Sequence, residues 1–272
     1  MKISVMSSGF RLGFEDGVRK AREIGAAGIQ MYAGETGLDF THEPLPCIAR
    51  GIRTFVDNVG LTVSAVCVDI GGFACEESLL SDRLLRTRNM LKLAARMDVH
   101  TVTSHIGKVP ADKVEPVYAQ LVTALREVGG YCAELGVAYA IETGPEKAVV
   151  LKSFLEDVAV PSIGVNLDPA NLVMCSDDDP VAATHTLGKY IRHTHAKDGI
   201  CLMRAVHKPW PDVPEGRPWI EVPLGCGEVD FPAWIRALRA EGYDGFLAIE
   251  REAGDDPAKD IKTALDFLKT QI

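Results

Sequence analysis

The feature that most constrains the fold of this chain is a regular alternation between two kinds of segment. Short apolar runs rich in β-branched residues alternate with amphipathic stretches of helical period, a pattern typical of βαβ units around a parallel sheet. We predict eight strands, at residues 3–7, 28–33, 62–69, 101–106, 138–143, 163–168, 191–197 and 245–250.

The stretches between these runs predict helices with one buried face. Between the second and third runs, apolar residues from Leu45 to Val59 recur at three- and four-residue intervals, and Gly60 is a typical helix end. Val114 begins a similar pattern after the fourth run. Each helix is therefore expected to lead through a short loop into the next strand.

Eight strands, each followed by a helix, predict an α/β fold: a single (β/α)8 TIM barrel over residues 1–272, with catalytic groups at the C-terminal ends of the strands. An open doubly wound sheet is the alternative. The chain has neither a G-x-G-x-x-G motif after its first strand nor a P-loop, so we expect no nucleotide cofactor. The long interval 199–227 is predicted to be an extended loop after strand 7 that folds over the barrel mouth.

Composition limits the partners of the protein. The net charge of −9 argues against a nucleic-acid partner, which clustered Lys and Arg would bind. No run is long enough for a membrane span, and the chain opens on strand-like sequence rather than a signal peptide, so we expect a cytoplasmic protein without a membrane partner. Seven scattered cysteines without a C-x-x-C pair fit reduced thiols. A homodimer or homotetramer is compatible with this composition.

Four strands of the second half each end on a residue that can ligate a metal: Glu142, Asp168, His195 and Glu250. A carboxylate directly after a buried strand is costly unless its charge is compensated, and a divalent cation compensates it. One such acid alone is more often an ion-pair partner or a helix cap, but four at corresponding strand ends predict a single metal site. Three carboxylates and one imidazole suit Mn²⁺ first, with Mg²⁺, Co²⁺ and Zn²⁺ as alternatives.

Several segments resemble the xylose isomerase-like TIM-barrel superfamily. They are PLGCGEVDF at 223–231, GYDGF at 242–246, HAKD at 195–198 and the dipeptide Leu167-Asp168. The similarity runs along the whole chain in strand order. The superfamily includes sugar epimerases, aldose-ketose isomerases, inosose dehydratases and isomerases, and endonuclease IV-like DNA repair enzymes.

The resemblance implies that Glu142, Asp168, His195 and Glu250 hold one divalent metal and that Glu142 and Glu250 are the catalytic acid and base. The function we expect is a metal-dependent sugar isomerase or epimerase, acting by proton transfer next to a carbonyl through a metal-stabilised enediolate. The alternative is a metal-dependent lyase or dehydratase on keto-cyclitols or 3-keto-glycosides. The expected partner is a small sugar or cyclitol substrate.

We assign substrate binding to His105, Lys197 and Asn171. His105 ends the fourth predicted strand, and Lys197 shares a strand face with His195 because alternate residues point the same way. Asn171 stands where ketose 3-epimerases of the group have a histidine, and Cys201 where they have an arginine, so the substrate geometry is expected to differ. Further candidates are two rim contacts, three stacking rings and a structural histidine: Arg11, Glu35, Phe73, Trp210, Trp219 and His193.

Two alternatives belong to a different class of function. A DNA repair nuclease of the superfamily needs further histidines for a three-zinc cluster, but the chain offers His105 alongside Asp69 and Asn171 at the matching places. Together with the negative net charge, this argues against a nuclease. The other alternative is a barrel that binds a ligand without any metal.

Overall fold

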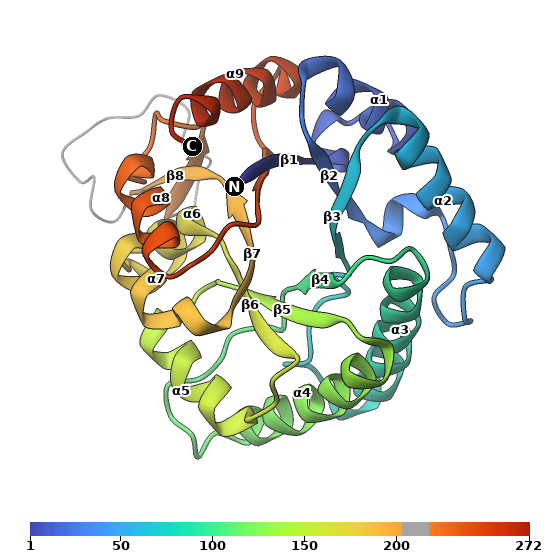
Figure 1. Ribbon diagram of the computed structural model, residues 1–272. Helices are drawn as coiled ribbons and strands as arrows, with labels where there is room; N and C mark the ends of the chain where they lie inside the picture. The colour runs from blue at the N-terminus through green and yellow to red at the C-terminus, as the bar shows by residue number, and fades with distance from the viewer. Residues whose placement is uncertain (203–217) are drawn as a thin grey trace.

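The computed structural model describes residues 1–202 and 218–272, and eight parallel strands in these ranges close into a barrel (Figure 1). Around the barrel the strands follow the order β1-β10-β7-β6-β5-β4-β3-β2. This confirms the predicted (β/α)8 barrel and excludes the open doubly wound sheet. The barrel strands are β1 (Lys2–Met6), β2 (Gly28–Tyr32), β3 (Thr62–Cys67), β4 (Thr101–Ser104), β5 (Ala138–Glu142), β6 (Ile163–Leu167), β7 (Ile191–Ala196) and β10 (Phe246–Ile249).

Helices form a ring around the strands (Figure 1). No helix in the described ranges is both long and apolar enough to cross a membrane. The helices are α1 (Phe14–Ile24), α2 (Pro46–Val59), α3 (Glu77–Arg96), α4 (Pro116–Leu135), α5 (Ala148–Val158), α6 (Pro169–Asn171), α7 (Pro180–Leu187), α8 (Phe231–Ala240) and α9 (Pro257–Lys269). Shorter turns are η1 (Ser7–Phe10), η2 (Ala33–Thr36), η3 (Leu172–Ser176) and η4 (Gly188–Tyr190).

Helix ends follow local sequence chemistry. Pro46 opens α2, where its missing N–H is not needed, and Gly60 ends the helix in the left-handed conformation at φ 80°. The prediction that Leu45 and Val114 belong to buried helical faces is wrong, because each residue precedes the first residue of its helix. Their exposures are 60% and 84%.

The interval after β7 contains a two-stranded antiparallel hairpin of β8 (Asp198–Cys201) and β9 (Trp219–Val222), as expected for an extended loop. Asp198 anchors it: its carboxylate accepts the backbone N–H groups of Gly199, Gly225, Gly227 and Val229. A Cβ on Gly227 would lie 2.1 Å from Asp198 Oδ1, so only glycine permits this approach. The predicted closure over the mouth and Trp210 fall on residues 203–217, outside the described ranges.

Parallel pairing brings all strand C-termini to one end of the barrel. The register pairs Glu142 with Asn166 and Asn166 with His193, so side chains from β5, β6 and β7 meet at similar heights. β7 also pairs with β10, which ends one residue before Glu250. The predicted ligands are thereby placed at the same end of the barrel.

Candidate functional site

The four predicted ligands converge at this end of the barrel. One ligand atom each of Glu142, Asp168, His195 and Glu250 lies within 4.8 Å of the others. Three of them are buried, and the side chain of Glu250 is 12% exposed. The structure thus forms a metal-binding type of site from residues more than a hundred positions apart.

Two buried atoms in this cluster have no hydrogen-bond partner among residues 1–202 and 218–272: Asp168 Oδ2 and His195 Nδ1. They lie 3.8 Å apart, and the same Nδ1 is 3.1 Å from Glu250 Oε2 and 3.4 Å from Glu142 Oε1. Buried polar atoms are normally satisfied, because leaving one unpaired costs about 1–3 kcal/mol. A divalent cation bound by oxygen and imidazole ligands satisfies both atoms, so the residues present fit such an ion.

The electrostatics of the cluster also favour a cation. Burial opposes a charged His195, but the carboxylates of Glu250 and Glu142 outweigh it and raise the pKa of the imidazole well above its ordinary value. Burial also opposes ionisation of Glu250, yet Lys197 and His195 hold the pKa of that carboxyl well below its usual range. The centre of the site therefore attracts positive charge.

His195 is oriented by groups below it in the barrel. Its Nε2 lies 3.1 Å from Gln30 Oε1, and Gln30 Nε2 donates to Thr103 Oγ1 at 2.9 Å. Asn166 Nδ2 lies 3.1 Å from the same imidazole nitrogen and 3.5 Å from Glu142 Oε2. Sequence reasoning missed Gln30 and Asn166, although a polar residue flanked by apolar ones inside a predicted strand was the available signal.

His193, which was expected to be structural, lies below the cluster. It is 2% exposed, and its Nδ1 is 3.1 Å from Asn166 Oδ1. Burial lowers the pKa of His193 to about 3. This imidazole is therefore neutral and supports the site through Asn166.

Two of the predicted substrate-binding residues contact Glu142. Asn171 Nδ2 donates to Glu142 Oε1 at 3.0 Å and to the carbonyl of Thr143 at 3.2 Å. His105 lines the cavity above, with its Nε2 3.5 Å from Glu142 Oε1. Asn171 therefore restrains this carboxylate, while His105 has a surface open to a ligand.

Lys197, the third of these residues, is buried among carboxylates. Its Nζ donates to Glu250 Oε2 at 3.1 Å and to Glu252 Oε2 at 2.6 Å, and lies 3.8 Å from Glu221 Oε2. Burial opposes its charge, but Glu250 and the other acids raise the pKa of Lys197 well above its ordinary value. Lys197 is thus a charged residue that holds Glu250.

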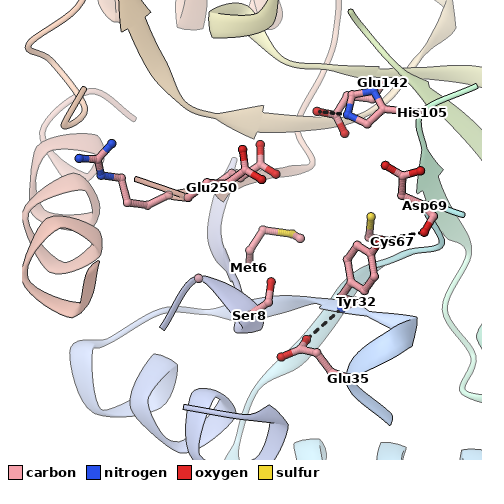
Figure 2. Close-up of a pocket in the computed structure, with 12 residues that line it drawn as sticks. Met6, Ser8, Tyr32, Glu35, Cys67, Asp69, His105, Glu142 and Glu250 are labelled. Carbon is pink, nitrogen blue, oxygen red and sulfur yellow. Dashed lines mark hydrogen bonds and ion pairs between the residues drawn. The ribbon is translucent and has the colours of Figure 1, made fainter. Parts of the chain in front are cut away.

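A cavity of about 380 Å³ opens above the cluster (Figure 2). Ligand pockets commonly have volumes of about 300–1,000 Å³, so this one suits a small molecule. Glu142 and Glu250 both reach it from the metal-binding side. Carboxylates of Glu35, Asp69 and Glu252 contribute further to its lining.

The remaining candidate residues differ in whether they reach the cavity. Glu35 lines the cavity and accepts Ser7 Oγ at 2.6 Å. Arg11 is not among the residues that line the cavity, and it donates to the carbonyls of Glu252 and Gly254. The prediction that Phe73 stacks on a substrate is wrong, because this side chain is 1% exposed and packs against Tyr139. Trp219 lies in β9, at the hairpin.

Comparison with known proteins agrees with this architecture. A family model described as xylose isomerase-like TIM barrel matches residues 18–271. The uncharacterized protein YfiH of Bacillus subtilis (strain 168) is 30% identical over 133 residues. That match covers 43% of this chain and 40% of the relative, so it spans less than half of either protein.

Solved structures extend the similarity to the whole barrel. A xylose isomerase domain protein from Planctomyces limnophilus has 25% identity and a TM-score of 0.82, over 99% of this chain and 96% of that one. The probable 3-DHS dehydratase AsbF of Bacillus anthracis has 20% identity and a TM-score of 0.78, over 99% of both chains. The 3-keto-D-glucoside 4-epimerase YcjR of E. coli has 16% identity and a TM-score of 0.75, over 99% of both. The last two similarities show a shared fold.

Proposed function

Because the chain belongs to the xylose isomerase-like TIM barrel family, we propose that it is a divalent-metal-dependent isomerase or epimerase of a sugar or cyclitol. The observation that carries this proposal is the position of Glu142 and Glu250 beside Asp168 Oδ2 and His195 Nδ1, the two unpartnered buried atoms. The likeness in fold to a sugar epimerase adds support.

The four cluster residues are the proposed metal ligands. A bound divalent cation, with Mn²⁺ expected before Mg²⁺, Co²⁺ or Zn²⁺, supplies a Lewis acid that stabilises negative charge on substrate oxygens. Asn171 restrains one oxygen of Glu142, and Lys197 restrains one oxygen of Glu250. Both glutamates are therefore held in place while their side chains line the same cavity.

Proton transfer is assigned to these two glutamates. Lys197 keeps Glu250 ionised, so this carboxylate is ready to accept a proton from a carbon next to a carbonyl. Glu142, or the same group, then returns a proton. Return to the neighbouring carbon, together with transfer of the hydroxyl proton between the two oxygens, interconverts aldose and ketose. Return to the opposite face of the same carbon epimerises it.

A lyase or dehydratase is the second candidate, and His105 favours it. Its imidazole lines the cavity 3.5 Å from Glu142, where it could donate a proton to a departing β-oxygen. The same removal of a proton by a glutamate would then end in loss of a hydroxyl or glycosidic group. Product analysis by NMR distinguishes a new double bond from an isomer or epimer.

The proposal is tested by hydrogen exchange in heavy water. The Mn²⁺-loaded protein is incubated with D-fructose, scyllo-inosose and a 3-keto-glucoside, and deuterium incorporation is followed by NMR. Glu142→Gln and Glu250→Gln should each reduce exchange by about 100-fold or more. Circular dichroism and bound-metal content are measured on both variants, so that lost exchange is not confused with lost structure or lost metal. Retained exchange in both folded variants would contradict the two-glutamate mechanism.

A further inference from the structure

Five of the twelve residues that line the cavity above the cluster are acids, and Arg251 and His105 line it as well. Besides Glu142 and Glu250, it is lined by Glu35, Asp69 and Glu252. The three carboxylates of the metal cluster already exceed the charge of one divalent cation. The additional acids therefore leave the cavity negative even when such an ion is bound.

Lys197 and Arg251, the two buried cations at this cavity, are already paired with carboxylates. Lys197 Nζ donates to Glu250 and Glu252, at 3.1 and 2.6 Å. Arg251 donates to Glu221 Oε1 at 2.6 Å and to Asp260 Oδ2 at 2.9 Å. Both positive charges are therefore offset by carboxylates before an anion enters the cavity.

Two of the acids that line the cavity, Asp69 and Glu35, each have a carboxylate oxygen that accepts no hydrogen bond from the described residues. Asp69 Oδ1 accepts the N–H of Gly71, and Glu35 Oε2 accepts Ser7 Oγ and the N–H of Tyr32. Within the described residues, no hydrogen bond is made to the second oxygen of either carboxylate. Asp69 lies across the cavity from Glu250 (Figure 2). Hydroxyl groups can donate to such oxygens, whereas ionised phosphate and carboxylate groups have no proton to donate.

We propose that the site takes an uncharged polyhydroxylated substrate, a free ketose or keto-cyclitol, and rejects phosphate esters and sugar acids. Asp69 and Glu252 are the specificity-determining residues, because both acids line the cavity and lie outside the metal cluster. This inference rests on the proposed function, since it assigns the substrate to the same cavity.

The test compares neutral and anionic probes of related shape on the full-length, Mn²⁺-loaded protein. The pairs are D-fructose with D-fructose 6-phosphate, and scyllo-inosose with 3-dehydroshikimate. Affinity is measured by saturation-transfer NMR titration, which does not require turnover. We expect each neutral probe to bind at least roughly tenfold more tightly than its anionic partner, because like charges oppose association. Equal or tighter binding of the anionic probes, or no binding of either neutral probe, overturns the inference.

A charge variant separates repulsion from size. In Asp69→Asn/Glu252→Gln the preference for neutral probes should shrink several-fold, because two negative charges have been removed from the cavity lining. The matched control is Asp98→Asn/Glu156→Gln, which makes the same chemical changes at exposed positions before β4 and near the end of α5, at the opposite end of the barrel. If the phosphate group is excluded by its bulk, the preference stays unchanged in both variants and the assignment of Asp69 and Glu252 fails.

Failure of this inference can be told from failure of the proposed function. Deuterium exchange into anionic probes as fast as into neutral ones overturns the inference and leaves a proton-transfer enzyme. Preferential binding of neutral probes without exchange into any of them upholds the inference and contradicts the proposed isomerase or epimerase.

Discussion

Gln30 and His195 come from strands that are not neighbours in the barrel, yet Gln30 Oε1 lies 3.1 Å from His195 Nε2. The Gln30 amide is fixed by its bond to Thr103 Oγ1, so its oxygen faces the imidazole. With Nε2 on this side, Nδ1 faces the carboxylates of Glu142 and Glu250, at 3.4 and 3.1 Å. Gln30 is thus a positioning residue for His195 in the proposed metal site.

Replacing Gln30 should weaken metal binding without removing a ligand. Gln30→Met fills a similar volume but has no acceptor for Nε2, so Mn²⁺ affinity should fall by about 10- to 100-fold. Titration of Mn²⁺ followed by electron paramagnetic resonance measures the change. Gln30→Glu keeps an acceptor and is the matched control. Unchanged affinity in a folded Gln30→Met protein would show that the imidazole needs no support from this side.

Metal should stabilise the protein through Asp168. At a Mn²⁺ concentration of 100 times Kd, the free energy of unfolding should rise by about 2.7 kcal/mol. Asp168→Asn retains an oxygen to cap α6 but removes one buried charge, so the Mn²⁺-dependent rise in Tm should disappear. Without metal, this variant should be at least as stable as the unaltered protein.

The control for Asp168 is Asp179→Asn, an exposed N-cap of α7. Asparagine is an equally good cap, so the Mn²⁺-dependent shift in Tm should persist there. Scanning calorimetry with Mn²⁺ and with EDTA gives both values. A full shift in the Asp168→Asn protein would place the metal elsewhere.

Asp198 should be a major source of local stability. Its two oxygens accept four backbone N–H groups around the hairpin, and Asp198→Asn replaces one acceptor oxygen with a donor. Two N–H groups then lose their partner, which should lower the free energy of unfolding by about 2–4 kcal/mol in urea denaturation. Asp230→Asn, at the N-cap of α8, should change it by less than about 0.5 kcal/mol. Similar losses in both variants would contradict the anchoring role.

Glu146 should give the stability of the protein a pH dependence. Burial raises the pKa of Glu146 from 4.5 to about 7, so the folded state holds this proton more tightly than the unfolded chain. The contribution of Glu146 is therefore fully present below pH 4.5 and is lost as the pH rises to about 7.

Glu146→Gln removes this titration and should gain stability relative to the unaltered protein between pH 5 and pH 8. The shift of the Glu146 pKa sets the relative gain at about 2.5 kcal/mol. Urea denaturation at both pH values measures it, with Glu156→Gln on the exposed face of α5 as the control. A difference that does not change with pH would show that Glu146 titrates normally in the folded protein.

The sequence predicted the barrel and the convergence of the four candidate ligands, because both depend on local patterns. Short apolar runs rich in β-branched residues identify the strands, and a residue directly after a strand is brought to the C-terminal end by parallel pairing. The pattern predicted residues near the ends of helices and strands less well. Leu45 fits the helical spacing but precedes the helix, and Phe73 lies in the core although it follows a strand.

What the sequence by itself determined is the order of strands and helices and the identity of four residues at equivalent strand ends, because these follow from periodicity along the chain. Only the tertiary structure decided that Gln30 supports His195 and that Lys197 is already paired with Glu250 and Glu252. It also decided that Asp69 lines the same cavity as the two glutamates of the cluster. Those contacts join residues whose separation is set by closure of the barrel, and no spacing along the chain encodes which side chains then meet.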